Sequence, residues 1–465
     1  MTSPTAPGFE RRLGLFQATT VNMTQMCGIG PFVTIPAMIS ALQGPQAMFG
    51  WVIGAIIAVA DGLVWAELGA SMPGAGGTYL YLREAFQYRT GRLMPFLFVW
   101  SAVLFIPLIM STGVIGLVQY AGYLWPDLVH GKGLSTLGHV VGIGVVGLVV
   151  LALYRRIGDI GKLTSVFFVV MLVSVFGVII AAFTHFHGSL AFDFPHDAGS
   201  KFLSGLGSGL VIAVYDYLGY NTSAYLGAEV RDPGRVIPRS IVYAILGIMG
   251  LYLLLQVGVL GVVPWQEAKE SSSVASLVLE RSWGKGVAQV FTVGIIITAF
   301  ASVFAGLLGG SRVPYNAARD KVFLPWFGRM HPRLHFPTVG LYAMGVVTAI
   351  GSLFTLTDVI SMLTAVFVLV QSVAQIAAVT VLRIRRPDMP RPYKMWLYPL
   401  PSLVALAGWI YIYQAAGLKP ILLSVAWLAA GVIAYLAWAR AERAWPFGHE
   451  EIHEGFAEHP GQASA

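Results

Sequence analysis

The pattern of polar and apolar positions divides the chain into long apolar stretches separated by short polar segments. A hydrocarbon core of about 30 Å requires roughly 20 apolar residues of helix. Each stretch is hydrophobic on all its faces, which is typical of a helix buried in lipid or in a bundle. We predict twelve membrane-spanning helices, none containing Lys or Arg, over residues 17–40, 46–69, 94–122, 136–154, 163–184, 203–226, 240–263, 286–310, 337–354, 357–382, 396–416 and 421–439.

The basic residues concentrate in alternate connecting segments. If the N-terminus is inside, the inner segments carry 23 and the outer loops 6 of the 29 Lys and Arg residues. Inner loops of membrane proteins carry this excess of positive charge. The pattern predicts a multi-pass protein of the cytoplasmic membrane whose N-tail (1–16) and C-tail (440–465) are cytoplasmic.

The composition agrees with a protein embedded in the lipid bilayer. The chain is 56% hydrophobic and 11% charged, with a mean hydropathy of +0.72, whereas soluble proteins have about 25% charged residues. The net charge of +7 comes from the inner loops, so we expect no nucleic acid as a partner. The single cysteine, Cys27, excludes a disulfide within the chain.

The first predicted span is interrupted in its middle by "QMCGIGPFVTIP", residues 25–36. Gly28, Gly30 and Pro31 are poor residues for a helix interior. Gly28 lies eleven residues into the span, which is about 17 Å from its start and near the bilayer midplane. We predict that this helix is broken there.

The sixth predicted span is interrupted in the same way by "AVYDYLGYNTSAYLGAE", residues 213–229, which contains Asp216, Gly219 and Asn221. Spans 1 and 6 are five spans apart, and an odd separation inverts the orientation of a repeat. Broken helices at matching positions of two inverted repeats indicate a midplane binding site in secondary transporters.

A broken helix leaves backbone groups that hydrocarbon cannot satisfy. The N-terminus of the second half-helix offers amides and a positive dipole end to a carboxylate, and the opposing end offers carbonyls to an ammonium. One break can therefore bind a zwitterion. The alternative for Gly28 and Gly30 is close helix packing without a ligand.

Four segments in order resemble the amino acid–polyamine–organocation (APC) superfamily of transporters. They are "GIGPF" (28–32), "AELGASMPGAGGTYLYLREAF" (66–86), "GAEVRDPGRVIPRSI" (227–241) and "SRVPYNAARDKVFLPWFGRMHP" (311–332). The resemblance implies an all-α, LeuT-like fold with a 5+5 inverted repeat and broken helices 1 and 6. The repeats would cover 17–184 and 203–382, followed by two C-terminal helices in 396–439.

The same resemblance implies the substrate-binding residues. The Ile29 and Gly30 amides would bind a substrate carboxylate, and carbonyls near Met26 would bind its amine. Tyr215 would be an aromatic gate, and Asp216, Tyr217 and Leu218 would follow in the unwound stretch. Gly219 would belong to the same substrate site. Tyr220 and Asn221 would line the same cavity, and Cys27 and Gly28 belong to the break itself, although Cys27 as a packed small residue is the simpler interpretation.

The sequence leaves open whether transport is coupled to H+ or to Na+. Many relatives carry a lysine in mid-span 5, where this chain has Met171, so their coupling cannot be transferred. Ser302 falls near a hydroxyl ligand of sodium-coupled relatives. The acids Asp61 and Asp216 favour an amine substrate, because the plant polyamine-uptake branch resembles this chain in having an acid near Asp61.

Ionisable groups in mid-membrane are functional candidates by default. Asp216 could pair with an ammonium, bind a proton or hold a cation, and its structural alternative is capping of freed amides. Asp61 is a candidate proton carrier or a buried hydrogen-bonding group. Glu67 and Glu229 lie near span ends, where we expect pairing with loop arginines such as Arg231 or Arg235.

Other signals do not indicate a site. "GIGVVG" (142–147) lies inside a span, and His449 and His453 lack a third metal ligand, so we predict no cofactor and no metal. We find no nucleophile–base pair and predict no enzyme. The sequence therefore predicts a permease for amino acids or related amines, with polyamine uptake as the alternative substrate and a membrane enzyme or channel as alternatives of another class.

Overall fold

A computed structural model describes residues 11, 13–74, 77–153, 160–331, 336–443 and 445–447, with no side-chain description for 160–168. Residues 154–159 and most of both tails, including His449 and His453, lie outside these residues. Apart from one two-stranded hairpin, the regular structure of the described residues is helical.

The helices have the following bounds: α1 Leu15–Met26, α2 Gly30–Leu42, α3 Ala47–Ser71, α4 Thr78–Thr90, α5 Leu93–Leu124, η1 Pro126–Leu128, α6 Thr136–Leu153, α7 Ile160–Thr184, α8 Gly188–Ala191, α9 Ala198–Tyr217, α10 Thr222–Tyr225, η3 Gly227–Glu229, α11 Pro233–Val262, α12 Trp265–Ala268, α13 Val274–Trp283, α14 Lys285–Gly310, α15 Arg312–Arg319, η4 Pro325–Gly328, α16 Thr338–Gly351, α17 Leu356–Phe367, the π-helical turn η5 Val368–Val373, α18 Ala374–Arg385, α19 Leu400–Ala415 and α20 Leu418–Ala441. The strands β1 Val129–His130 and β2 Gly133–Leu134 pair antiparallel.

Seven helices of the described chain are long and apolar enough to cross a membrane, and α1 with α2 forms an eighth candidate bent by 56°. These helices are α3, α5, α6, α11, α14 with α15, α17 with α18, and α20. Three shorter apolar helices lie within 169–184, 338–351 and 400–415. Each of the twelve predicted ranges overlaps one or more of the observed helices.

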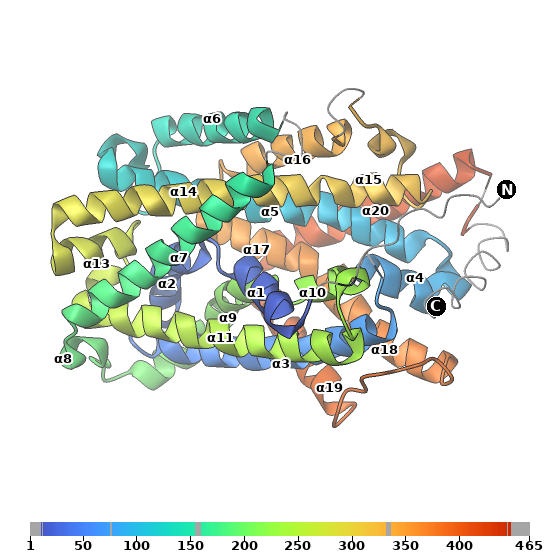
Figure 1. Ribbon diagram of the computed structural model, residues 1–465, viewed down its shortest axis with the longest axis horizontal. Helices are drawn as coiled ribbons and strands as arrows, with labels where there is room; N and C mark the ends of the chain where they lie inside the picture. Colours follow the sequence, from blue (N-terminus) through green and yellow to red (C-terminus); the bar gives the residue numbers. More distant parts are fainter. Residues whose placement is uncertain are drawn as a thin grey trace.

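The interrupted helices lie in the middle of the bundle (Figure 1). The helices α3 and α11 pack against each other on one side, and α5 packs against α14 and α17 on the other. Between them, α1 packs on α11 and α2 packs on α9. This arrangement encloses both predicted breaks in protein, as backbone without helical hydrogen bonds requires at membrane depth.

Peripheral helices carry apolar side chains on their outer faces. Leu148, Leu151, Val140, Leu422 and Ile433 are more than half exposed on α6 and α20. Contiguous apolar surface of this kind is unfavourable in water and suits contact with lipid tails. The helical bundle is therefore built as a multi-pass membrane protein.

Candidate functional site

The first break falls where the sequence predicted it. The helix α1 ends at Met26, and the Cys27 backbone (φ −95°, ψ 69°) leaves the helical region although its amide still donates to the Met23 carbonyl (2.8 Å). The helix α2 restarts at Gly30, with Pro31 in its first turn, where a missing amide costs nothing. The predicted break at Gly28 is confirmed.

The break leaves donors unused at the start of α2. Within the described part of the chain, the amides of Gly28, Ile29 and Gly30 donate no hydrogen bond, and no side chain caps this end of the helix. Both the unpaired amides and the helix dipole attract an anion. This end of α2 therefore has the properties of a carboxylate site.

The second break lies later in the chain than we predicted. Asp216 and Tyr217 are in the last turn of α9, and only Leu218 to Asn221 are unwound before the short helix α10. The expectation that Asp216 and Tyr217 lie in the unwound stretch is therefore wrong. The helix ends at Tyr217, because the Leu218 backbone (φ −59°, ψ 132°) leaves the helical region. Gly219 follows with a φ of +113°, which glycine adopts without strain.

The two breaks touch each other. A Cβ added at Gly219 would lie 2.8 Å from the Gln25 Cβ and 3.2 Å from the Met26 nitrogen. The absence of a side chain at Gly219 thus allows the end of α9 to approach the end of α1. Residues almost two hundred positions apart are brought together, as expected for a site built from two half-helices.

Asp216 connects α9 to the start of α2. Its side chain is 2% exposed, and one carboxylate oxygen accepts a hydrogen bond from the Thr34 hydroxyl. The other oxygen, Oδ1, has no hydrogen-bond partner. A Cβ added at Gly30 would lie only 2.3 Å from this Oδ1, so the carboxylate lies directly against the first turn of α2.

Tyr252 of α11 joins the ends of α1 and α9. Its hydroxyl lies 2.9 Å from the Met26 carbonyl oxygen and 3.1 Å from the Asp216 carbonyl oxygen. A tyrosine hydroxyl carries one hydrogen, so it donates to one of these carbonyls at a time. Tyr252 is completely buried, and the sequence analysis missed it because a tyrosine inside an apolar helix gives no signal.

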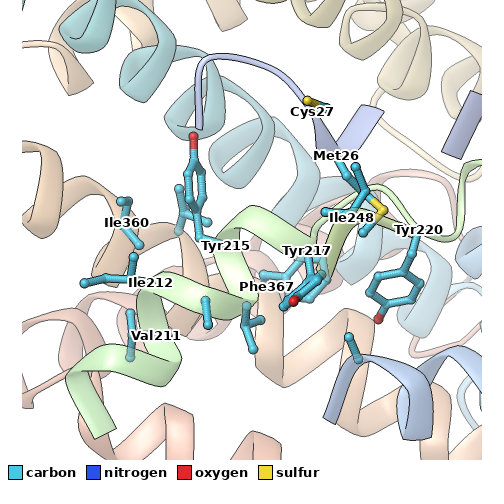
Figure 2. Close-up of a cluster of buried hydrophobic side chains, with 14 of the residues drawn as sticks. Met26, Cys27, Val211, Ile212, Tyr215, Tyr217, Tyr220, Ile248, Ile360 and Phe367 are labelled. Carbon is cyan, nitrogen blue, oxygen red and sulfur yellow. The ribbon is translucent and has the colours of Figure 1, made fainter. Parts of the chain in front are cut away.

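Tyr215 extends from α9 toward the segment that links α1 to α2 (Figure 2). Its hydroxyl is hydrogen-bonded to the Thr112 hydroxyl of α5. Its Cε1 would lie 3.9 Å from a Cβ at Gly30. The ring therefore borders the break, at the position where the family resemblance expects an aromatic gate.

Ser302 of α14 lies against the first break. A Cβ added at Gly28 would lie 3.1 Å from the Ser302 Oγ, which donates to the Thr298 carbonyl (3.1 Å). Met171, which the resemblance aligns with a lysine of relatives, is buried in α7. The break thus has a hydroxyl oxygen beside it.

Tyr220 and Asp61 form a separate buried group. The Tyr220 hydroxyl donates to one Asp61 carboxylate oxygen, and the Trp409 indole nitrogen donates to the other (3.0 Å). Tyr220 points away from the segment that follows Cys27 (Figure 2). Asn221 is buried, and its carbonyl accepts from the Ala224 amide (3.0 Å). Asp61 therefore links the unwound part after α9 to α19.

The predicted arginine partners of Glu67 are wrong. Glu67 accepts two hydrogen bonds from the Arg383 guanidinium, of which the longer is 2.7 Å. Its carboxylate also lies 3.8 Å from the Arg391 Nε and accepts a hydrogen bond from the Met395 amide (2.8 Å). Arg383, in the last turn of α18, and Arg391, which follows α18, reach Glu67 because α18 packs on α3.

The two predicted partners have contacts elsewhere. Arg235 pairs with Asp232 (3.7 Å), and the Arg231 Nε donates to the Arg11 carbonyl (3.2 Å). Within the described residues, the structure gives Glu229 a backbone hydrogen bond from Leu13 (2.9 Å) and no ion pair. The expected structural role at the span end is thus filled by Glu67 with different partners.

Cys27 is buried at the break, and the described residues contain no group of three His, Cys, Asp or Glu side chains that could hold a metal ion. A bundle of membrane-length helices whose interrupted segments meet in its centre defines a membrane transporter. The chain belongs to the amino acid permease family, whose profile, described as Amino acid permease, matches residues 13–438. The resemblance to the APC superfamily is confirmed.

Relatives along nearly the whole chain carry out transport. Over 450 residues the chain is 24% identical to the branched-chain amino acid permease BcaP of Bacillus subtilis, covering 93% of each chain. It is 26% identical to the serine/threonine exchanger SteT of the same organism, covering 87% of this chain and 91% of the relative. An uncharacterised transporter of Mycobacterium tuberculosis is 28% identical, covering 92% and 91%. The protein is therefore an amino acid transporter and not an enzyme.

Proposed function

We propose that this protein is a secondary active transporter that binds its amino acid between the two breaks and moves it by alternating access. One observation carries the proposal: the amides of Gly28, Ile29 and Gly30 are unpaired, and Gly30 lies against Asp216 in the last turn of α9. A substrate carboxylate binds these amides. The ammonium group binds at the opposite side, where the Met26 carbonyl ends α1.

The remaining side chains complete this site. Tyr215 closes it from α9 and is held by Thr112. Asp216 contributes a carboxylate beside the amides, and Ser302 contributes a hydroxyl beside Gly28. These groups are the candidates for binding a coupling proton or sodium ion, with Asp61 as a more distant candidate for the proton.

The fold that we propose has twelve spans with both termini in the cytoplasm. The agreement between the twelve apolar ranges and the observed helices supports it, as does the excess of basic residues in the inner segments. Residues 17–184 and 203–382 form the two inverted repeats of a LeuT-like arrangement, and 396–439 adds two helices. The protein resides in the cytoplasmic membrane.

The topology can be tested with single cysteines, because Cys27 is the only native one. In a Cys27→Ser background, a cysteine at Lys132 should react with an impermeant maleimide added outside intact cells. A cysteine at Arg235 should react only after the cells are opened. Labelling of both from the same side would contradict the proposed orientation.

Substrate identity is tested with the purified full-length protein in proteoliposomes. Counterflow of labelled leucine, isoleucine, valine, serine and threonine is measured, because the relatives' names specify branched-chain amino acids, serine and threonine. Saturable counterflow of at least one of them is expected. Counterflow of putrescine alone would favour the amine alternative, for which Asp216 would pair directly with the ammonium.

A further inference from the structure

Large apolar side chains are exposed where α18 ends and α19 begins. The segment that joins the two helices lies at the edge of the bundle (Figure 1). Four of its apolar residues are more than half exposed: Ile384, Trp396, Leu397 and Leu400. Exposed apolar surface rimmed by polar residues marks contact with a membrane or with another molecule. We call these four residues, together with the neighbouring basic residues Arg385 and Lys394, the α18–α19 patch.

Contacts across the segment bring the two halves of the patch together. The Tyr398 hydroxyl donates to the Thr380 hydroxyl (3.2 Å), and the Arg383 guanidinium carbon lies 3.9 Å from the centre of the Tyr398 ring. The residues that precede α19 therefore lie along the last two turns of α18. This places their exposed side chains beside the exposed end of α18.

Buried polar contacts hold the segment in this position. The Arg391 side chain is only 8% exposed, and its guanidinium donates to the carbonyls of Leu382 and Arg386 (both 2.9 Å) at the end of α18. Leu397 has a left-handed backbone with a φ of +56°. A bulky residue adopts this conformation only where its surroundings enforce it. The exposed side chains are therefore presented by a rigid support.

The same segment carries a surplus of positive charge. Residues 383–395 contain four arginines, one lysine and a single acid, Asp388. Three of the arginines contact Glu67 or Glu84. Arg385 and Lys394 are exposed, and neither has an ion pair or hydrogen bond among the described residues. Two unpaired cations thus remain against one acid.

The patch has the properties of the headgroup region of a membrane. Tryptophan is enriched at the membrane–water interface, and clusters of Lys and Arg directly after a membrane span bind anionic lipid headgroups. The apolar surface continues from Leu400 along α19 to Leu403 and Ile410, which are 56% and 47% exposed. Because this outer face of the helix suits lipid tails, a lipid fits the whole surface better than a soluble protein does.

We propose that the α18–α19 patch binds one anionic phospholipid. Arg385 and Lys394 bind its phosphate, and its acyl chains lie on Trp396, Leu397 and Leu400. Under the topology proposed above, which places this end of α18 in the cytoplasm, the lipid belongs to the inner leaflet. The bound lipid joins α18 to α19 and so stabilises the packing of the two C-terminal helices on the rest of the bundle.

Native mass spectrometry of the full-length protein in detergent tests the proposal. The protein is titrated with phosphatidylglycerol or with phosphatidylcholine that has the same acyl chains, and the bound copies are counted. The wild type should bind the first phosphatidylglycerol more tightly than phosphatidylcholine. Arg385→Gln combined with Lys394→Gln should weaken phosphatidylglycerol binding by about tenfold to thirtyfold, since each basic residue contributes roughly a fivefold factor near an anionic headgroup.

Lys285→Gln combined with Lys419→Gln is the matched control. It removes the same charge from the starts of α14 and α20, where both lysines are exposed and have no ion pair among the described residues. This variant should bind phosphatidylglycerol as the wild type does. Added phosphatidylglycerol should also raise the Tm of the wild type and of the control, but not the Tm of the patch variant.

Four results would overturn the proposal. The first is equal affinity of the wild type for the two lipids, and the second is unchanged phosphatidylglycerol binding by the patch variant. The third is displacement of the lipid by millimolar inorganic phosphate, which would assign the site to the free anion. The fourth is tighter binding of a glutamate-rich peptide than of the lipid, which would assign it to a protein. Binding in detergent requires no transport, so each of these results leaves the proposed amino acid site intact.

Discussion

Replacing Gly30 by alanine adds one methyl group at the contact between the two breaks. The new Cβ would lie 2.3 Å from the Asp216 Oδ1 and 3.4 Å from its Cγ. Real Cβ atoms essentially never approach closer than 3.0 Å, so the Asp216 carboxylate or the two helices must shift by at least 0.7 Å along this line. The Asp216 side chain has little freedom to move, because it is buried and hydrogen-bonded to Thr34.

Two energetic effects oppose each other in this variant. Alanine is favoured over glycine inside a helix by about 0.5–1 kcal/mol, while overpacking a buried site costs about 1–3 kcal/mol. The folding free energy should therefore fall by at most about 2.5 kcal/mol. Transport should suffer more, because displacing binding groups by about 1 Å can reduce activity about a hundredfold.

The assay is counterflow in proteoliposomes, combined with thermal unfolding followed by tryptophan fluorescence. We expect Gly30→Ala to lower kcat/KM between about tenfold and a hundredfold with a small change in Tm. Gly250→Ala is the control, because a Cβ at Gly250 of α11 would meet nothing within 4 Å. If Gly30→Ala transported as well as Gly250→Ala, the carboxylate would not lie against α2 and the proposed site would be wrong.

Three further variants test the buried polar contacts. Tyr252→Phe removes the hydroxyl that donates to the Met26 or Asp216 carbonyl, so it should lower stability by about 1–3 kcal/mol and raise KM. Tyr120→Phe is the control: it loses a comparable buried hydrogen bond to the Phe32 carbonyl (2.9 Å) and should lower Tm with KM unchanged. Equal effects of the two variants on KM would contradict a positioning role for Tyr252. Asp61→Asn replaces one carboxylate oxygen by an NH2 group, which then faces either the Tyr220 hydroxyl or the Trp409 indole, both of which donate to Asp61. The variant should lower Tm by several degrees in a thermal unfolding scan. An unchanged Tm would exclude this hydrogen-bond network. Glu67→Gln leaves the charge of Arg383 without its partner and should lower the free energy of unfolding by about 3–5 kcal/mol. Adding Arg383→Met to the same chain should restore part of that stability. A double variant no more stable than Glu67→Gln would refute the ion pair.

Glycine and proline made the breaks predictable from the sequence. Their backbone preferences act locally, so Gly28, Gly30 and Pro31 locate the first break without knowledge of the neighbours. Gly219 carried the same information for the second break. We gave weight to the polar Asp216 instead, and the helix extends through it to Tyr217, ending at the turn formed by Leu218 and the positive-φ Gly219.

The partners of the buried polar groups could not be predicted from the sequence. Thr34, Thr112, Tyr252 and Trp409 are ordinary residues of apolar helices, and their roles depend on contacts across long sequence separations. The same holds for Glu67, whose acidic character indicated an ion pair but not which arginines form it. Packing between helices decides such pairs, and periodicity within one helix carries no information about it.

The bond between Trp409 and Asp61 bears on how much of the chain a minimal carrier needs. The second proposed repeat ends at residue 382, which invites removal of α19 and α20 as an appendage. Truncation before α19 would delete the indole donor and leave one Asp61 oxygen without its partner in apolar surroundings, at a penalty of about 1–3 kcal/mol or more. The last two helices are thus part of the folding unit, and engineered fragments should retain them.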